Sequence, residues 1–312
     1  MTKAFVFPGQ GSQAVGMGVE LAGAFEVARL TFQEVDDVLN QKLSKLMAEG
    51  PQEELTLTEN AQPAIMAVSV AVMRVLEKEG GVDLAKAAKF VAGHSLGEYS
   101  ALCAAGAFTL ADTARLLKLR GQAMQRAVPV GVGAMAAIIG AELADVQAIA
   151  KDAAQGEVCA AANDNAPGQV VVSGHKSAVE RAIAIAAERG FKRAMMLPVS
   201  APFHCALMQP AADAMAEALA ETAIKAPVVP VVANVIASAA SDPDQIRNLL
   251  VEQVTGAVRW RECVLYMKEQ GVESLVELGA GKVLAGLAKR IDKEIAAVSL
   301  GTPADIEAFL KG

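Results

Sequence analysis

Ser95 lies in the pentapeptide GHSLG at residues 93–97, which fits the pattern G-x-S-x-G. This pattern is typical of a nucleophilic serine held on a sharp turn between a strand and a helix. Its glycines let the strand and the helix approach closely around such a strained turn. An apolar run over residues 90–92 precedes the pattern, and a helical pattern follows from 96 to about 106. Because both elements are in place, the sequence favours a nucleophile over a chance match.

A serine nucleophile needs a general base because its hydroxyl is barely ionised at neutral pH. The chain has three histidines. His94 adjoins Ser95, and neighbouring side chains at such a turn point apart, so we expect it to pack or hydrogen-bond locally. His175 follows a glycine where a helix is expected to begin, which predicts a helix-start or surface residue. His204 lies in a strand-to-helix connection, where a base is expected, and we favour it.

Two further groups could act on a substrate. An oxyanion hole needs two N–H donors. The N–H of Leu96 follows the nucleophile, and the glycine-containing turn at residues 9–11 could supply the second. At 1.5 Å per residue, the helix after Ser95 and its return partner bring Arg120 back level with the serine. A buried arginine there could bind a carboxylate through two hydrogen bonds. Without further information, a solvated surface arginine is the default interpretation.

The segment PGQGSQA at residues 8–14 follows an apolar strand and fits the dinucleotide-binding pattern G-x-G-x-x-G/A. That fingerprint requires an acidic residue about 20 positions later, at the end of a second strand. Glu34, Asp36 and Asp37 have the distance, but they lie in a helical pattern over residues 25–39. A nicotinamide enzyme is therefore disfavoured, and a loop whose N–H groups face the active site competes with a plain turn.

Composition predicts a soluble, cytoplasmic protein with a sizeable core. Of 312 residues, 53% are apolar and 20% charged, which suits one large domain or two unequal ones. The net charge of −7 argues against binding to nucleic acid or to a membrane surface. The four cysteines show no C-x-x-C, which predicts reduced thiols and no metal site. The longest apolar stretch, residues 64–76, is shorter than the about 20 residues that a membrane span needs.

Strand and helix patterns alternate along most of the chain, which predicts a mainly parallel sheet covered on both faces. The expected strands are residues 4–7, 90–92, 228–235, 274–278 and 295–300. The expected helices are residues 25–39, 62–78, 110–127, about 205–222, 244–254 and 260–269, with Thr109 as an N-cap. Residues 40–60 look polar and irregular, with Pro51 opening a short turn of helix.

Between Pro129 and Pro198 the pattern changes to βαββαβ, the order of a ferredoxin-like unit. The expected strands are residues 133–139, 157–162, 169–173 and 192–199. The expected helices are residues 141–154 and 176–188, and a turn is expected at 163–168. We therefore predict an α/β fold in which residues 129–199 form a small domain inserted into a larger one built from residues 1–128 and 200–312.

Four motifs occur in the same order as in malonyl-CoA:acyl carrier protein transacylases, a family that the whole chain resembles. They are FPGQGSQ at residues 7–13, GHSLGEY at 93–99, APFH at 201–204 and VRW at 258–260. The resemblance implies a hydrolase-like large domain with a ferredoxin-like small one. It also implies cofactor-free transfer of malonyl from malonyl-CoA to the phosphopantetheine thiol of acyl carrier protein, for fatty acid synthesis.

The resemblance implies a ping-pong reaction through malonyl-Ser95, with His204 as the base and Arg120 on the malonyl carboxylate. The other implied roles are oxyanion-hole donors at Gln10 and Leu96, a histidine-orienting main-chain carbonyl at Gln253, selection against an α-methyl branch by Phe203, and a pantetheine or CoA contact at Asn163.

Carrier proteins of this pathway are acidic, as is this chain, so binding needs a local basic patch. Lys192 with Arg193, or Arg259 with Arg261, could supply it, and ordinary solvated charges are the alternative for each pair.

Two other classes stay open. A serine hydrolase or thioesterase acting on acidic acyl thioesters would use the same Ser95 and His204. A catalytically silent scaffold subunit is disfavoured because Ser95, His204 and Arg120 are all intact.

Overall fold

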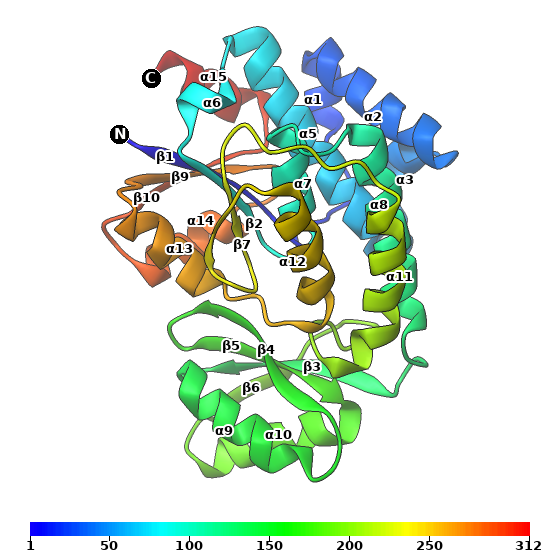
Figure 1. The fold of residues 1–312 in the computed structure, drawn as a ribbon, viewed down its shortest axis with the longest axis vertical. Helices are drawn as coiled ribbons and strands as arrows, with labels where there is room; N and C mark the ends of the chain where they lie inside the picture. Colours follow the sequence, from blue (N-terminus) through cyan, green and yellow to red (C-terminus); the bar gives the residue numbers. More distant parts are fainter.

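The computed structural model describes residues 1–312, and the larger of its two sheets contains the strand that leads to Ser95 (Figure 1). The strand order is β10-β9-β1-β2-β7-β8, and every neighbouring pair is parallel except β7 with β8. The strands are β1 (Lys3–Phe7), β2 (Phe90–Gly93), β7 (Val231–Ala233), β8 (Ser238–Ala240), β9 (Ser274–Leu278) and β10 (Ala296–Leu300). The predicted mainly parallel sheet is confirmed.

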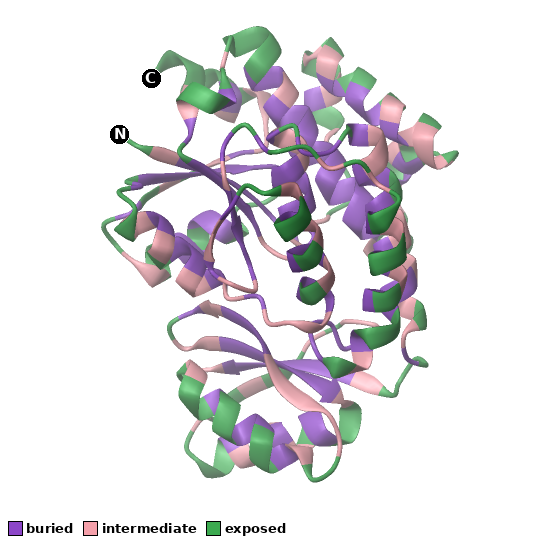
Figure 2. Ribbon diagram, in the orientation of Figure 1, coloured by how far each residue is buried: buried purple, intermediate pink, exposed green.

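Alternation along β1 sends side chains to two separate cores, as the period of a strand requires. Phe5 and Phe7 pack in the core that contains the long helix α5 (Thr58–Gly80), which is buried along most of its length. Ala4 and Val6 pack in a second core with α13 (Trp260–Glu269) and α14 (Val283–Ile291) on the other face. Figure 2 shows the buried residues concentrated in the sheet and in α5.

The remaining helices of this part surround the sheet. They are α1 (Val19–Ala24), α2 (Glu26–Leu39), α3 (Leu43–Glu49), α4 (Gln52–Thr56), α6 (Leu84–Ala87), α7 (Gly97–Ala104), α8 (Leu110–Arg126), the 3-10 turn η1 (Ala206–Met208), α11 (Gln209–Ala220), α12 (Pro243–Thr255) and α15 (Pro303–Lys311). Thr109 caps α8 as predicted, since its hydroxyl accepts the Asp112 N–H at 3.0 Å.

The second sheet is antiparallel with the order β4-β5-β3-β6. Its elements are β3 (Gly133–Ile139), α9 (Leu143–Ala154), β4 (Cys159–Ala166), β5 (Gln169–His175), α10 (Lys176–Glu188) and β6 (Arg193–Met196), which is the predicted βαββαβ order. Both helices cover one face, and the other face turns toward the large sheet (Figure 1). We propose that residues 129–199 are the inserted small domain, because β3 begins and β6 ends inside those limits.

Two predicted segments are wrong and a third is wrong in part. The short turn of helix expected after Pro51 is confirmed as α4, but residues before it are not irregular: α3 forms there because it buries Leu43 and Leu46 beneath a polar exterior. The turn expected at 163–168 belongs mostly to β4, whose two register irregularities disturb the alternation of polar and apolar residues. The strand expected at 228–235 spans only β7, since Pro230 has no N–H to donate, and β8 was not predicted.

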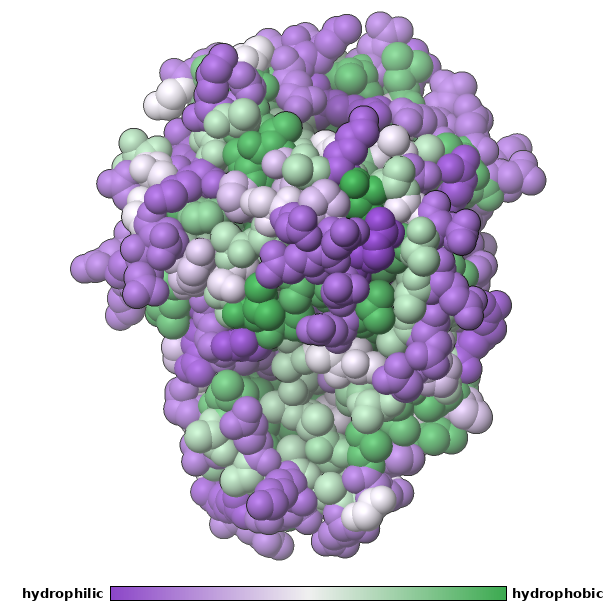
Figure 3. Space-filling model, in the orientation of Figure 1, coloured by the Kyte–Doolittle hydropathy of each residue, from purple (hydrophilic) through white to green (hydrophobic).

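Apolar and polar side chains mix over the surface. Figure 3 shows hydrophobic residues gathered across the middle of one face, where the two sheets approach each other. An isolated bridge between Asn163 of β4 and Val258 ties the small sheet to the connection between α12 and α13. None of the helices combines the length and apolar character needed to cross a bilayer.

Candidate active site

Ser95 stands on a turn between β2 and α7, with a φ of 53°. This left-handed conformation is unfavourable for a residue with a Cβ. Two glycines allow the turn to close. A Cβ on Gly93 would lie 1.9 Å from the carbonyl of Gly97, and a Cβ on Gly97 would lie 2.2 Å from the carbonyl oxygen of Phe7. Strand, turn and helix therefore have the geometry that the G-x-S-x-G pattern predicted.

His204 is the histidine that contacts this serine. Its Nε2 lies 2.7 Å from the Ser95 Oγ, while its Nδ1 lies 2.8 Å from the carbonyl oxygen of Gln253 and 3.1 Å from that of Gly256. Because carbonyl oxygens only accept, Nδ1 carries the proton and Nε2 is left to accept from the serine hydroxyl. Burial lowers the pKa of His204 to about 3, with a further contribution from the charge of Arg120, so the ring is neutral at pH 7.

Arg120 is buried, with 1% of its surface exposed, so the alternative of a solvated arginine is excluded. Its Nη1 donates to Gln62 Oε1 at 2.9 Å, and its Nη2 donates to Gln253 Oε1 at 2.8 Å and to Ser95 Oγ at 3.2 Å. The Nε has no partner, and no carboxylate of the chain forms an ion pair with the guanidinium. A buried cation without an anion is costly, and a ligand carboxylate would compensate it.

Two backbone N–H groups face the same cavity as the serine. Neither the N–H of Gln10 nor that of Leu96 donates a hydrogen bond within the protein, and both residues line the cavity beside Ser95. The loop at residues 9–14 packs directly on the turn, because a Cβ on Gly9 would lie 2.6 Å from the carbonyl oxygen of His94. The pair can therefore serve as oxyanion donors.

The same loop has no dinucleotide-binding context. After β1 the chain enters α1 and α2, and Glu34, Asp36 and Asp37 lie on α2 as expected. The next strand of the sheet, β2, begins only at Phe90.

The cavity around Ser95 has a volume of about 460 Å³, a size typical of small-molecule sites. The loops and helices around the large sheet line one side of it, and the small sheet lines the other. Phe203 and Met124 contribute apolar wall to the first side, and Asn163 of β4 and Leu197, just after β6, contribute to the second. Phe203 and Asn163 are both buried.

The other two histidines have structural contacts. His94 packs, as one of the two expected alternatives has it: its ring lies 5.8 Å from that of Trp260. Its hydrogen bond is not local, since its Nε2 lies 2.8 Å from Asn165 Oδ1 on β4. His175 immediately precedes α10, as predicted, and its Nδ1 accepts the N–H of Val158 at 2.9 Å.

Three residues of the site were not found from the sequence. Gln62 holds Arg120 together with Gln253, Asn165 bonds His94, and Asn234 accepts the N–H of Ser95 at 2.8 Å. Although Gln253 was named, only its carbonyl was given a role. Asn234 carried a usable signal, because it is a polar residue in an otherwise apolar strand pattern.

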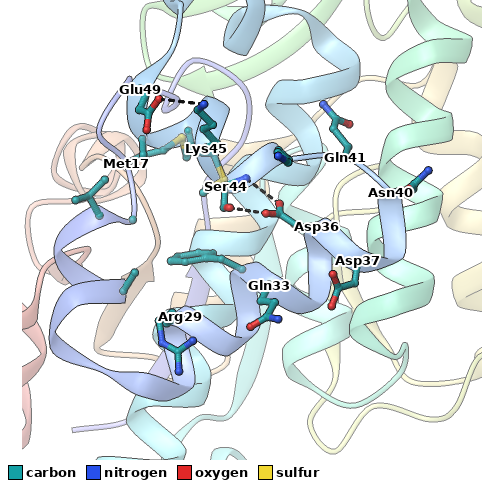
Figure 4. Close-up of a pocket in the computed structure, with 17 residues that line it drawn as sticks. Met17, Arg29, Gln33, Asp36, Asp37, Asn40, Gln41, Ser44, Lys45 and Glu49 are labelled. Atoms are coloured by element: carbon teal, nitrogen blue, oxygen red, sulfur yellow. Dashed lines mark hydrogen bonds and ion pairs between the residues drawn. The ribbon is translucent and has the colours of Figure 1, made fainter.

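A larger groove of about 860 Å³ lies between α1, α2 and α3 (Figure 4). Its polar residues bond one another: the Asp36 carboxylate accepts the backbone N–H of Ser44 at 2.8 Å, and Lys45 pairs with Glu49 at 3.8 Å. Its Ser44 hydroxyl bonds Asp36, but no histidine and no buried arginine line this groove, so the cavity at Ser95 is the candidate active site.

Comparisons with known proteins point to one family. Residues 4–300 match the model of the acyl transferase domain. The malonyl CoA-acyl carrier protein transacylase of Escherichia coli K12 is 50% identical over 308 residues, covering 99% of this chain and 98% of that protein. The protein of the same name from Bacillus subtilis strain 168 is 44% identical over 309 residues, covering 99% of this chain and 96% of that protein.

Two solved structures agree in fold. The acyl-carrier-protein-S-malonyltransferase of Bartonella henselae superimposes with a TM-score of 0.97 at 57% identity, covering 100% of this chain and 99% of that one. A malonyl-transacylase solved in complex with its type II PKS acyl-carrier protein superimposes with a TM-score of 0.96 at 46% identity, covering 100% of this chain and 99% of that one.

Proposed function

The chain belongs to the acyl transferase domain family, and from that premise we propose that it transfers malonyl from malonyl-CoA to the phosphopantetheine thiol of acyl carrier protein, for fatty acid synthesis. One observation of the site carries the substrate class. A buried arginine that forms no ion pair in the chain lies 3.2 Å from the Ser95 hydroxyl, which itself contacts the base His204. A thioester whose acyl group ends in a carboxylate satisfies both the arginine and the serine.

The first half-reaction acylates Ser95. His204 Nε2 takes the hydroxyl proton while Oγ attacks the thioester carbonyl. The N–H groups of Leu96 and Gln10 stabilise the oxyanion. The intermediate collapses to malonyl-Ser95, and the CoA sulfur leaves with the proton from Nε2. The Gln253 carbonyl on Nδ1 holds the tautomer during both transfers, so no triad carboxylate is needed.

The second half-reaction reverses the roles. The phosphopantetheine thiol gives its proton to His204 Nε2, and its sulfur attacks the malonyl-Ser95 carbonyl. Ser95 Oγ leaves and regains the proton. Arg120 holds the malonyl carboxylate through both halves. Protons and electron pairs balance among the serine, the imidazole and the two thiols, so we propose that no cofactor takes part.

The walls of the cavity supply selectivity and the path for the thiol. Phe203, next to His204, is a bulky apolar wall that would crowd an α-methyl branch of the acyl group. Asn163 lines the side built by β4 and could bond the amides of pantetheine. These roles rest on their place in the cavity and on the family.

The two candidate basic patches differ in their contacts. Arg259 bonds Glu262 at 2.9 Å, and Arg261 bonds Asp164 at 3.0 Å and Glu142 at 2.9 Å, so their charges are compensated. Lys192 and Arg193 are exposed, and neither forms an ion pair.

We propose that Lys192 and Arg193 receive the carrier protein. The chain runs on from them through β6 to residues 197–199, which line the cavity, so a partner bound there has a short path to Ser95.

The four cysteines form no disulfide, which supports a cytoplasmic location.

The experiment that tests this function is intact mass spectrometry after mixing with malonyl-CoA. We expect a malonyl adduct that is absent in Ser95→Ala and that disappears when holo-acyl carrier protein is added, with malonyl appearing on the carrier. An adduct lost to water at the same rate with and without carrier would instead identify a thioesterase, the second class that this serine and histidine allow.

A further inference from the structure

Asn234 is a fully buried polar residue beside the turn that carries Ser95. Strands β2 and β7 pair at Val91 with Val231 and at Ala92 with Val232, and Asn234 directly follows β7. It therefore lies where the strand ladder stops and the turn begins.

The side-chain amide of Asn234 continues that ladder. Its Oδ1 accepts the Ser95 N–H at 2.8 Å, and its Nδ2 donates to the carbonyl oxygen of Gly93 at 2.7 Å. One donor and one acceptor in a planar group reproduce what a further peptide unit of β7 would offer. Unlike a further residue of β7, the side chain of Asn234 can reach the backbone of the Ser95 turn, where the chain no longer runs parallel to β7.

A second amide holds the other side of the serine. Gln253 Nε2 donates to the carbonyl oxygen of Ser95 at 3.0 Å. Because the peptide bond is planar and trans, fixing this carbonyl points the Leu96 N–H in the opposite direction. The peptide before Ser95 and the peptide after it are thus both fixed, which stabilises the left-handed φ of 53°.

Asn234 is itself anchored. Its N–H donates to the buried carboxyl of Glu98 at 2.9 Å, and its carbonyl accepts the N–H of Arg259 at 3.2 Å. Glu98 stands in the first turn of α7, immediately after the serine turn. The helix α7 therefore begins beside Ser95 and, through Glu98, also holds Asn234 in place.

We propose that Asn234 is a positioning residue for Ser95, whose side-chain amide holds the nucleophile turn in its reactive conformation and, together with Gln253, keeps the Leu96 N–H aimed at the oxyanion. The inference rests on the proposed acyl-serine chemistry, although it concerns the turn and not the acyl group.

The test compares Asn234→Ala with Asn234→Asp, which keeps an oxygen for the Ser95 N–H, and with the control Asn60→Ala. Asn60 is a second buried asparagine, with bonds to the Glu54 carbonyl and to Gln41 at 2.9 Å, and it does not line the cavity. A fluorophosphonate, which labels activated serines and contains neither malonate nor CoA, reports on the turn alone.

We expect Asn234→Ala to slow labelling and malonyl-CoA turnover about 10²-fold, the usual cost of displacing a reacting group by about 1 Å. The KM for malonyl-CoA should stay within about threefold, since Arg120 is untouched. Asn234→Asp should lose less than Asn234→Ala. Asn60→Ala should lower the unfolding midpoint without slowing labelling.

Labelling of Asn234→Ala within about twofold of the wild type would overturn the proposal. If this variant does not fold, Asn234→Ser replaces it as the truncation, with the same criterion. A wild type that is labelled but not acylated by malonyl-CoA would refute the proposed function separately, because the labelling comparison does not depend on the acyl donor.

Discussion

Replacing Arg120 by alanine should abolish the preference for an acidic acyl group more than it damages the serine chemistry. Truncating one partner of a buried, hydrogen-bonded charge pair costs about 2–5 kcal/mol. At about 1.4 kcal/mol for each factor of ten, this predicts a loss of about 30-fold to about 4,000-fold in the rate of acylation by malonyl-CoA. The burial of Arg120 and its lack of an ion-pair partner in the chain favour the upper part of this range.

Acetyl-CoA provides the internal reference because its acyl group has no carboxylate. Arg120→Ala also leaves the Oε1 atoms of Gln62 and Gln253 without their donor and removes a contact to Ser95. These losses slow both substrates alike. The ratio of malonyl to acetyl acylation therefore reports what the guanidinium contributes specifically to an acyl group with a carboxylate.

Single-turnover acylation followed by intact mass gives both rates in one assay. Arg120→Lys keeps the charge but lacks two parallel donors, so it should fall between the wild type and Arg120→Ala. Arg115→Ala is the matched control, because Arg115 lies on the same helix with its side chain 61% exposed. Equal losses for malonyl-CoA and acetyl-CoA in Arg120→Ala would refute the carboxylate-binding role.

Two further predictions concern the base and the partner. Because His204 has its pKa lowered from the ordinary 6.5 to about 3, the acid limb of malonyl-CoA acylation should lie well below pH 6.5, and a limb at 6.5 would contradict the buried geometry. The unfolded chain binds a proton at this histidine near pH 6.5, so the stability that His204 contributes is present above that pH and is lost as the pH falls toward 3. A plot of the free energy of unfolding against pH should show this loss as a slope that is absent in His204→Gln. Lys192→Glu with Arg193→Glu should raise the KM for holo-carrier protein about tenfold without changing acylation. The same double charge reversal at the exposed Lys86 of α6 and Lys311 of α15 should not, because Figure 1 shows both helices at the end of the molecule opposite to β6.

Much of the fold could be predicted because most elements carry their own signal. Buried parallel strands such as β9 are continuous apolar runs, and helices such as α13 show one apolar face, so their bounds were found to the residue. The failures occur where local signal is weak or is overridden. The helix α3, which was not predicted, is stabilised by packing its leucines in the core around α5. In the irregular β4, polar residues such as Asn163 and Asp164 are buried, which disturbs the sequence pattern of a strand.

The site divides in the same way. Ser95 lies in a local motif and could be placed from spacing alone. Helix lengths brought Arg120 level with the serine but left a solvated arginine as the default, and only the resemblance to a family gave it a role. His204 was favoured from its loop context, and the structure shows its contact with Ser95. Asn234 and Gln62 act through side-chain contacts to residues more than 50 positions away, and no local pattern encodes such contacts.

The contacts of Arg120 link substrate recognition to the strength of the base. Its charge lies beside the Ser95 hydroxyl and is one of the causes that lower the pKa of His204. A carboxylate bound to the guanidinium compensates that charge, so the imidazole becomes more basic when an acidic acyl group is in place. An acyl group without a carboxylate leaves the cation uncompensated and the base weak. Malonyl would then be selected twice by one residue, first through the energy of binding and again through the reactivity of the serine that receives it.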